Sequence, residues 1–297
     1  MSGGRSAGGA TGAVFVTPLL LLTLAVIVVP TLGAFALSLT DFDIYALGDP
    51  TRLRFVGLTN YAALAADPHF AQVIGNTILF AALGVPAAIA LSLAAALLLA
   101  SATVRWAPVW RVLLFAPYVT TLVATAVVWQ YLLDTRTGLL NALLVGVGLA
   151  PVDWLGSPAT SIPAIVLFVV WKVFGYNMIV FTAALALVPA ELYEAARLDG
   201  AGAWTRFRHV TLPGIGPALL LAAILSVANF LQIFTEPYVM THGGPAQSTE
   251  TVLYYLFSQG FDWWSLGLAS AVAVVLFAAI LALTAVQAAF GARFEWL

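Results

Sequence analysis

The chain lacks cysteine altogether and has only one lysine and three histidines. Without cysteine there is no disulfide, thiolate metal site or cysteine nucleophile. The histidines, His69, His209 and His242, lie far apart and do not form the HxxxH or HExxH spacing of a helical zinc site. Lys172 follows Trp171, so the phosphate-binding pattern GxxxxGK followed by Ser or Thr is absent. Any ATP hydrolysis linked to this chain must therefore be done by another chain.

Charge is equally scarce. Charged residues make up 8% of the 297 positions, against about a quarter in an ordinary soluble domain. Apolar residues make up 62%, and the mean hydropathy is +1.03. Such a chain has too little polar surface for a soluble globular enzyme and is too apolar for a disordered one. The composition predicts an integral membrane protein.

Six long apolar stretches are present, and a spanning helix needs about 20 mostly apolar residues. Barrel strands would be shorter and would alternate polar with apolar residues. The sequence therefore predicts an all-α membrane protein with six transmembrane helices. The first stretch is longer than the core of a signal peptide, so we expect a retained helix. The predicted spans are residues 14–39, 73–100, 112–133, 162–188, 216–235 and 266–289.

The placement of arginine predicts the orientation, because basic residues accumulate in cytoplasmic loops. If the N-terminus is inside, seven arginines fall in inner segments and three in outer ones. Nine acidic residues then lie outside and four inside. We therefore expect both termini in the cytoplasm. The inner arginines are Arg5, Arg105, Arg111, Arg197, Arg206, Arg208 and Arg293, and the outer ones are Arg52, Arg54 and Arg136.

The loops leave no room for a separate folded domain. We expect residues 1–12 and 291–297 to be short cytoplasmic tails and residues 13–290 to form one transmembrane domain. The apolar segment 137–149 lies between Asp134 and Asp153 and is too short to span a membrane. It is expected to form a helix on or in the outer face, more often a packing element than a functional one.

The inner loop 188–217 has the pattern of two short helices around a glycine. Pro189 can open the first helix, and the charge of Glu194 suits its N-terminal half. Gly200 is free to adopt the left-handed conformation that ends a helix. Aromatic and arginine side chains, including Trp204, would occupy different sides of the second helix. A docking surface fits this pattern, and an amphipathic loop resting on the bilayer fits it equally well.

The residues of this loop resemble the EAA loop of ABC importer permeases. Glu194-Ala195-Ala196 is followed by Gly200, nine further residues and Val210-Thr211-Leu212-Pro213. The family ends this pattern with I-x-L-P, so the chain departs only by valine for isoleucine. Other segments resemble the first of the two permease subunits in carbohydrate importers. These are residues 55–61 (FVGLTNY), 67–68 (DP), 76–77 (NT), 85–86 (VP), 154–155 (WL), 241–245 (THGGP) and 267–271 (GLASA).

The resemblance implies the type I ABC importer permease fold, in the inner membrane of a bacterium or archaeon. The chain would be the channel subunit of an ATP-driven, binding-protein-dependent importer of a sugar or oligosaccharide. The EAA loop of that family couples the permease to a cytoplasmic ATPase dimer. Coupling roles follow for Glu194, Ala195, Gly200 and Leu212, while Arg206, like Arg208, is added on physical grounds alone.

The implied partners are a second permease subunit, the ATPase dimer, an external substrate-binding protein, the sugar and the lipid bilayer. No cofactor, metal or nucleic acid is expected for the chain itself, because ATP and Mg²⁺ would bind to the ATPase. The chain would therefore be a transport subunit and not an enzyme.

Polar residues inside the predicted spans are the candidates for a solute site, because they are costly in a membrane and face the protein interior. Lys172 lies near the middle of the fourth span, where a charge costs about 2.5–3.5 kcal/mol. Trp171, Tyr176 and Asn177 are its neighbours. Aromatic faces suit the C–H groups of a sugar ring, and amides or charges suit its hydroxyl groups. The four residues do not all share one helix face, so only some would line a cavity.

A second cluster ends the fifth span. Asn229, Gln232 and Glu236 recur on one helix face and are followed by Tyr238. Glu236 would be able to pair with Lys172. A purely structural ion pair and interhelical hydrogen bonds, each worth about 0.6 kcal/mol, explain the same residues. Trp129 and Gln130 in the third span form a weaker candidate.

A site this poor in arginine and lysine suits neutral sugars better than phosphorylated ones. Two other classes of membrane protein are possible for so apolar a chain. A proton-coupled secondary sugar transporter would show two similar halves and membrane carboxylates, and only Glu236 comes near. A membrane-embedded enzyme would need clustered histidines and acids at the membrane face, which the sequence lacks. The EAA pattern favours the importer over both.

Overall fold

The computed structural model describes residues 7–293 apart from 50, 52, 102 and 103. Arg5 and Arg52, the first half of the predicted N-terminal tail and the end of the predicted C-terminal tail lie outside the described residues. Within them, the regular structure is helical, and the extended pairing is an isolated bridge between Thr40 and Phe55. The prediction of an all-α chain is confirmed.

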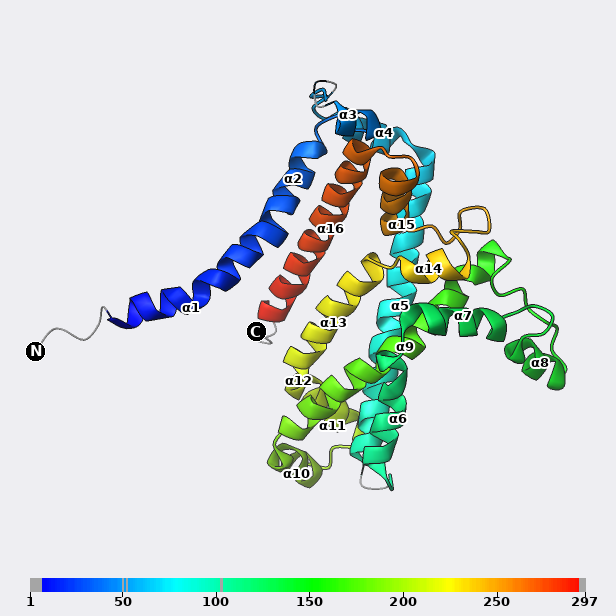
Figure 1. Ribbon diagram of the computed structural model, residues 1–297. Coiled ribbons are helices and arrows are strands. Elements are labelled where there is room, and N and C mark those ends of the chain that lie inside the picture. The colour runs from blue at the N-terminus through cyan, green and yellow to red at the C-terminus, as the bar shows by residue number, and fades with distance from the viewer. Residues whose placement is uncertain (1–6, 50, 52, 102–103, 294–297) are drawn as a thin grey trace, which may run out of the picture. The chain divides into compact units, whose positions relative to one another are not determined.

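The helices follow one another with short connections (Figure 1). Three π-helical turns, Leu24–Val28, Phe207–Thr211 and Ser258–Asp262, continue neighbouring helices. In chain order the α-helices are α1 (Ala7–Thr23), α2 (Val29–Leu37), α3 (Ile44–Gly48), α4 (Thr59–Ala66), α5 (Pro68–Ala100), α6 (Ala107–Val119), α7 (Leu122–Leu132), α8 (Leu139–Gly146), α9 (Pro158–Leu187), α10 (Ala190–Leu198), α11 (Ala203–Arg206), α12 (Leu212–Gly214), α13 (Gly216–Leu231), α14 (Thr235–Met240), α15 (Val252–Phe257) and α16 (Leu266–Arg293).

Within the described residues, four helices are long and apolar enough to cross a membrane without interruption. They are Phe15–Leu37, Pro68–Ala100, Pro158–Leu187 and Leu266–Arg293. Two further apolar segments are bent pairs: α6 meets α7 at 98°, and Ala203–Gly214 meets α13 at 71°. The part of the chain that the structure describes therefore has four candidate spans, or six if each bent pair is one span. The predicted third span is wrong as a single helix, because its backbone breaks at Thr120 and Thr121.

The chain divides into two compact units, of which the first comprises the chain up to Asp67 and Leu256–Val275. Asn60, from the recognised segment 55–61, holds the turn after α2. Its Nδ2 donates to the carbonyls of Ser38 and Thr40, at 2.8 Å each. Gly267, from the segment 267–271, packs so tightly that a Cβ would collide with the Thr40 carbonyl. These two segments are therefore fixed by local packing.

The second unit comprises Pro68–Tyr255 and Leu276–Leu297. Its centre is α9, which packs against α5 and α6, while α13 packs on α5 and α14 on α7. The core of this unit includes the fully buried Phe80, Phe168 and Phe230. Gly84 of α5 admits the Phe230 ring, where a Cβ would collide with it. Of the long apolar helices in the described part of the chain, α9 is the one most covered by the chain itself, with 67% of its apolar window buried.

The predicted helix within segment 137–149 is confirmed as α8, and a buried asparagine holds it. The Asn141 amide Nδ2 donates to the carbonyls of Thr135 (3.0 Å) and Val152 (2.8 Å). Its Oδ1 accepts from the Val152 N–H and from Trp154 Nε1, both at 3.0 Å. One side chain therefore fastens both ends of the connection from α7 to α9, as expected of a packing element.

The turn between α7 and α8 is built on Asp134. Its Oδ1 accepts hydrogen bonds from the Thr137 N–H (2.7 Å), the Thr137 hydroxyl (2.8 Å) and the Arg136 N–H (3.0 Å). The bonds from Thr137 and then Arg136 favour the ionised carboxyl, so they lower the pKa of Asp134 below its ordinary value. This turn therefore carries a carboxylate that stays ionised in mildly acidic solution.

Candidate functional site

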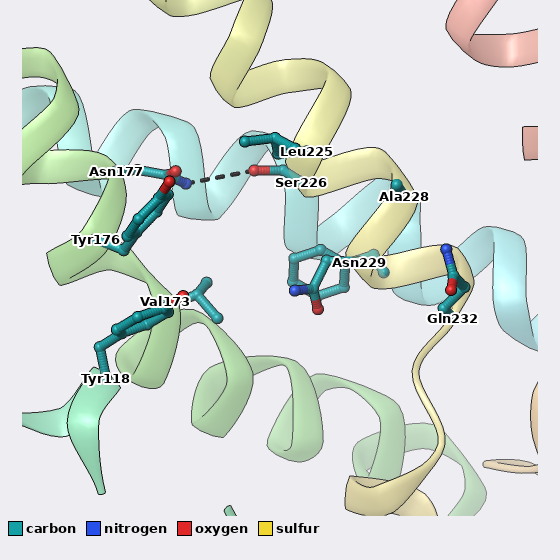
Figure 2. A pocket seen from close by; sticks show the side chains of 10 residues that line it. Tyr118, Val173, Tyr176, Asn177, Leu225, Ser226, Ala228, Asn229 and Gln232 are labelled. Carbon is teal, nitrogen blue, oxygen red and sulfur yellow. Dashed lines mark hydrogen bonds between the residues drawn. The ribbon is translucent and has the colours of Figure 1, made fainter. Parts of the chain in front are cut away.

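A cavity of about 500 Å³ lies beside α9 and α13 in the second unit (Figure 2). No carboxylate, lysine or arginine is among its lining residues, which combine aromatic, amide and apolar side chains. They are Tyr118, Val173, Tyr176, Asn177, Leu225, Ser226, Ala228, Asn229, Phe230 and Gln232. The cavity is thus suited to an uncharged solute that offers both apolar faces and hydroxyl groups.

Two tyrosines form one wall of this cavity. The rings of Tyr118 and Tyr176 are stacked, with centroids 5.1 Å apart and planes inclined by 24°. Tyr118 comes from the end of α6 and Tyr176 from the middle of α9, so the stack joins two elements. Beside Tyr176, Asn177 Nδ2 of α9 donates to Ser226 Oγ of α13 at 3.3 Å and joins the two helices (Figure 2).

Half of the predicted solute residues line the cavity. Tyr176 and Asn177 come from α9, while Asn229 lies near the end of α13 and Gln232 directly follows that helix. The sequence reasoning missed Tyr118 and Ser226. A signal for Ser226 was present, since it precedes Asn229 by three residues and extends the same face toward the start of the helix. Tyr118 gave no comparable signal, because its position depends on the break after α6.

Trp171 and Lys172 lie outside the cavity lining. Trp171 packs into the core, with its ring centroid 5.4 Å from that of Trp129 and 6.4 Å from that of Phe168. Lys172 is 8% exposed, and its Nζ donates to the carbonyls of Pro117 (3.1 Å) and Thr120 (2.7 Å) and to Thr120 Oγ1 (3.1 Å). Both residues therefore contact protein groups in this structure.

Glu236 and Tyr238 lie on α14, also away from the cavity lining. Glu236 is buried and interacts electrostatically with Lys172, yet the described ion pairs do not include a direct contact between them. The suggested direct pairing is therefore wrong in this structure. Tyr238 belongs to an aromatic cluster, with ring centroids 5.2 Å from Phe234, 5.6 Å from Tyr254 and 6.2 Å from His242.

The weaker candidate pair, Trp129 and Gln130, is engaged in packing. Trp129 joins Trp171 in the core. Gln130 Nε2 donates to the carbonyls of Val239 (2.9 Å) and Met240 (3.1 Å), which attaches α7 to the end of α14. Neither residue is among those that line the cavity.

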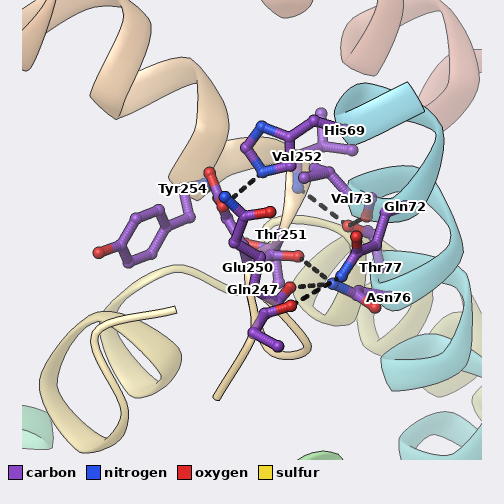
Figure 3. Close-up of polar contacts among 11 residues, drawn as sticks. His69, Gln72, Val73, Asn76, Thr77, Gln247, Glu250, Thr251, Val252 and Tyr254 are labelled. Atoms are coloured by element: carbon purple, nitrogen blue, oxygen red, sulfur yellow. Dashed lines mark hydrogen bonds and ion pairs between the residues drawn. The ribbon is translucent and has the colours of Figure 1, made fainter. Parts of the chain in front are cut away.

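The loop 241–251 contains residues 241–245, which resemble the importer family. Polar side chains along one face of α5 hold this loop by hydrogen bonds (Figure 3). Although His242, Ala246 and Gln247 have positive φ values, of 50°, 48° and 60°, these bonds hold the loop in one shape. His69 binds the Glu250 carboxylate (2.8 Å), and Gln72 donates to the Ala246 carbonyl (3.1 Å). Asn76 donates to the carbonyls of Gln247 (2.8 Å) and Glu250 (2.9 Å). The Thr77 hydroxyl accepts from the Val252 N–H (2.9 Å) at the start of α15.

The loop 188–217 contains the two predicted short helices. Pro189 precedes α10, and Gly200 follows it with φ of 79°. The Gly200 N–H donates to the Arg197 carbonyl (3.0 Å) and the Ala201 N–H to the Ala196 carbonyl (2.9 Å). This pair of bonds is the Schellman arrangement that closes a helix on a left-handed residue. The predicted left-handed glycine is confirmed.

The surface of this loop is largely exposed. Glu194 and Ala195 of α10 are exposed, whereas Arg206 of α11 and Leu212 of α12 are half-buried. Trp204 is 70% exposed and stacks on Phe207, with ring centroids 5.5 Å apart.

A cavity of about 760 Å³ opens between α10, α11 and the end of α5. Its lining combines arginine, aromatic and small side chains: Leu97, Ser101, Tyr193, Arg197, Ala203, Trp204, Arg206, Phe207 and Thr211. Tyr193 and Thr211 are joined by a hydrogen bond of 3.0 Å between their hydroxyl groups, so α10 is tied to the π-helical turn before α12. The loop is therefore a defined two-helix surface with an open cavity.

Several known proteins are similar to this chain over most of its length. A probable ABC transporter permease of Bacillus subtilis is 34% identical over 239 residues, covering 80% of this chain and 82% of the relative. The lactose transport system permease of Rhizobium radiobacter is 34% identical over 254 residues, covering 84% and 83%. The trehalose/maltose transport system permease of Thermococcus litoralis is 31% identical over 280 residues, covering 94% and 93%.

The fold agrees with these sequence relationships. A chain of a bacterial ABC transporter that imports the acidic polysaccharide alginate superposes with a TM-score of 0.79 at 20% identity, covering 98% of this chain and 99% of that one. The profile of binding-protein-dependent transport system inner membrane components matches residues 88–296. The chain is therefore a multi-pass permease subunit of an ABC importer, without catalytic activity of its own, and it belongs to the family of binding-protein-dependent transport system inner membrane components.

Proposed function

We propose that this permease imports a neutral sugar or oligosaccharide, and that the cavity of Figure 2 contributes to its path. The supporting observation is the cavity lining. The stacked Tyr118 and Tyr176 offer ring faces, Asn229 and Gln232 offer amides, and charged side chains are absent from the lining residues. The relatives that transport lactose and trehalose or maltose point to the same class of solute.

We further propose that the chain crosses the membrane six times, with each bent pair counted as one span and both termini in the cytoplasm. Among the described arginines, those on the proposed inner side outnumber Arg54 and Arg136 on the outer side, which supports this orientation. The solute would arrive through the outer side, delivered by an external binding protein.

The proposed coupling surface is the loop 188–217, which would dock in a cleft of a cytoplasmic ATPase dimer. The exposure of Glu194 and Ala195, together with the left-handed turn at Gly200, supports this proposal. Arg206 lines the neighbouring cavity and would contact acidic groups of the ATPase, while Leu212 begins the helix that leads into α13. ATPase closure would then move α13 and its polar residues at the solute cavity.

A second, related permease subunit completes the proposed assembly. Its surface would help to enclose a solute at the cavity beside α9 and α13. Trp171, Lys172, Glu236 and Tyr238 contact protein groups in this structure and are not proposed as direct solute contacts.

The test is ATP hydrolysis by the complete complex in proteoliposomes, with its binding protein and a panel of lactose, trehalose, maltose and arabinooligosaccharides. Stimulation by one of them is expected. Tyr176→Ala should reduce that stimulation about tenfold, since loss of an aromatic contact worth about 1.4 kcal/mol is a factor of ten.

Tyr131→Ala is the matched control, because Tyr131 is 75% exposed on α7 and outside the cavity. Uptake that follows an ion gradient without the ATPase would overturn the importer proposal in favour of ion-coupled transport. Equal effects of the two tyrosine variants would overturn the cavity assignment alone.

A further inference from the structure

The environment of Lys172 assigns it a specific mechanical task. Its ammonium group has three donors, and each has an acceptor at the end of α6: the carbonyls of Pro117 and Thr120 and the Thr120 hydroxyl, at 3.1, 2.7 and 3.1 Å. These acceptors are 55 and 52 residues away in sequence. Lys172 therefore binds a backbone turn of another helix with its full hydrogen-bonding capacity.

The end of α6 needs such a partner. The last carbonyls of a helix lack donors within the helix, and α6 ends inside an apolar segment that bends by 98° into α7. The Pro117 carbonyl also accepts from the N–H (3.3 Å) and the hydroxyl (2.7 Å) of Thr120, so Lys172 adds to a turn that is partly closed by Thr120 itself. In a membrane interior, water does not replace the missing donors. A cation at a helix C-terminus also interacts favourably with the helix dipole. Lys172 satisfies both requirements at once.

The same turn carries one wall of the solute cavity. Tyr118 lies between Pro117 and Thr120, the two residues that Lys172 holds. Its ring stacks on Tyr176, which lies one helical turn after Lys172 on α9. Helix α9 therefore contacts this turn at two places: Lys172 donates to its backbone carbonyls, and Tyr176 stacks on the ring of Tyr118.

We propose that Lys172 is a positioning residue, which fixes the break between α6 and α7 and thereby places Tyr118 in the cavity wall. Lys172 acts on the solute only through this turn and makes no contact with it. The link to solute binding rests on the function proposed above, whereas the effect on the break does not.

The chain has no cysteine, so two introduced cysteines can be spin-labelled on the purified chain before the partner subunits are added. Cysteines replace Val112 on α6 and Val128 on α7, which are 69% and 55% exposed. The distance distribution between the labels is measured in the assembled complex without solute. In the parent chain we expect one narrow distribution. Lys172→Met should broaden and shift it, and Lys172→Arg, which keeps charge and donors, should restore it.

Uptake of the sugar that stimulates the parent complex should fall with Lys172→Met and should be near the parent value with Lys172→Arg. If Lys172→Met fails to assemble, Thr120→Val keeps the lysine and removes one of its three acceptors, and a partial broadening is expected. Thr125→Val is its control, because it removes the bond from Thr125 to the Thr120 hydroxyl (3.0 Å) and leaves the lysine contacts in place, so it should broaden the distribution less. An unchanged narrow distribution in Lys172→Met and Thr120→Val would overturn the proposal, and lost uptake with an unchanged distribution would indicate a direct solute contact. If no sugar stimulates the parent complex, the proposed function fails, while the distance result still stands.

Discussion

Replacing Gly200 with alanine would test whether the left-handed turn after α10 shapes the surface offered to the ATPase. Space is available for the new methyl group, because a Cβ at this position has no atom within 4 Å. The perturbation is therefore conformational, since φ at Gly200 is 79°. An L-residue in this region costs about 1–2 kcal/mol relative to its preferred conformation.

The alternative for the variant is to leave the left-handed region. It would then lose the two bonds that close α10, from Gly200 to Arg197 and from Ala201 to Ala196. Each is worth about 0.5–1.5 kcal/mol, so both routes cost a similar amount. If docking requires the native turn, affinity for the ATPase should fall roughly tenfold, because about 1.4 kcal/mol is a factor of ten.

Gly202→Ala is the control for an added methyl group without a left-handed φ, because Gly202 is two residues away, has φ of −67° and also has open space around it. It is the N-cap of α11, so its own cost is loss of a favourable cap, and Gly202→Ser, which restores a good N-cap, removes that cost. The assay is the affinity of the purified permease pair for the ATPase subunit, together with the ratio of solute taken up to ATP hydrolysed. We expect a loss for Gly200→Ala and near-native values for Gly202→Ala. Equal behaviour of the two variants would refute the reasoning from the turn.

Three further predictions concern the second unit. Gly84→Ala should lower the free energy of unfolding by about 1–3 kcal/mol, since its methyl group would collide with the Phe230 ring. Gly75→Ala is the control, because a methyl group there meets open space. Similar melting temperatures for the two variants would contradict the packing argument. Asn141→Ala should lower the free energy of unfolding by about 1–3 kcal/mol, because the buried backbone groups of Val152 would lose their hydrogen bonds to the Asn141 amide. Unaltered resistance of the loop around α8 to proteases would argue against this role. Folding lowers the pKa of Asp134, so the stability that its carboxylate contributes is present above the ordinary carboxyl pKa and is lost as the pH falls through the folded pKa. The difference in melting temperature between the parent chain and Asp134→Ala should therefore shrink as the pH falls below the ordinary carboxyl pKa. A difference that stays constant would count against this role of Asp134.

The locations of the long helices were predictable from sequence, whereas the breaks were not. Apolar runs of sufficient length mark α5, α9 and α16 clearly, even though α9 contains Lys172, because hydropathy averaged over a span records what a membrane interior tolerates. The run 112–133 looks equally continuous, yet it breaks at Thr120. The donor that stabilises this break is Lys172, which is supplied by a helix distant in sequence.

The predicted residues that line the cavity also differ from those that do not in whether local sequence alone determines their position. Asn229 and Gln232 were found because helical spacing alone places them on one face. Lys172 was expected to face a solute because a membrane charge usually marks a pathway, but a free helix end in the same membrane needs a charge equally. Local periodicity does not distinguish these two uses, because only the tertiary arrangement shows which acceptors lie within reach.

The contact between Lys172 and α6 also bears on how the chain is made. Synthesis proceeds from the N-terminus, so α6 is complete before α9 leaves the ribosome. The acceptors at Pro117 and Thr120 therefore exist before the lysine that must be inserted. A charge whose burial would hinder membrane integration of an isolated helix thus meets a ready partner, and the order of segments in the gene becomes part of the insertion pathway.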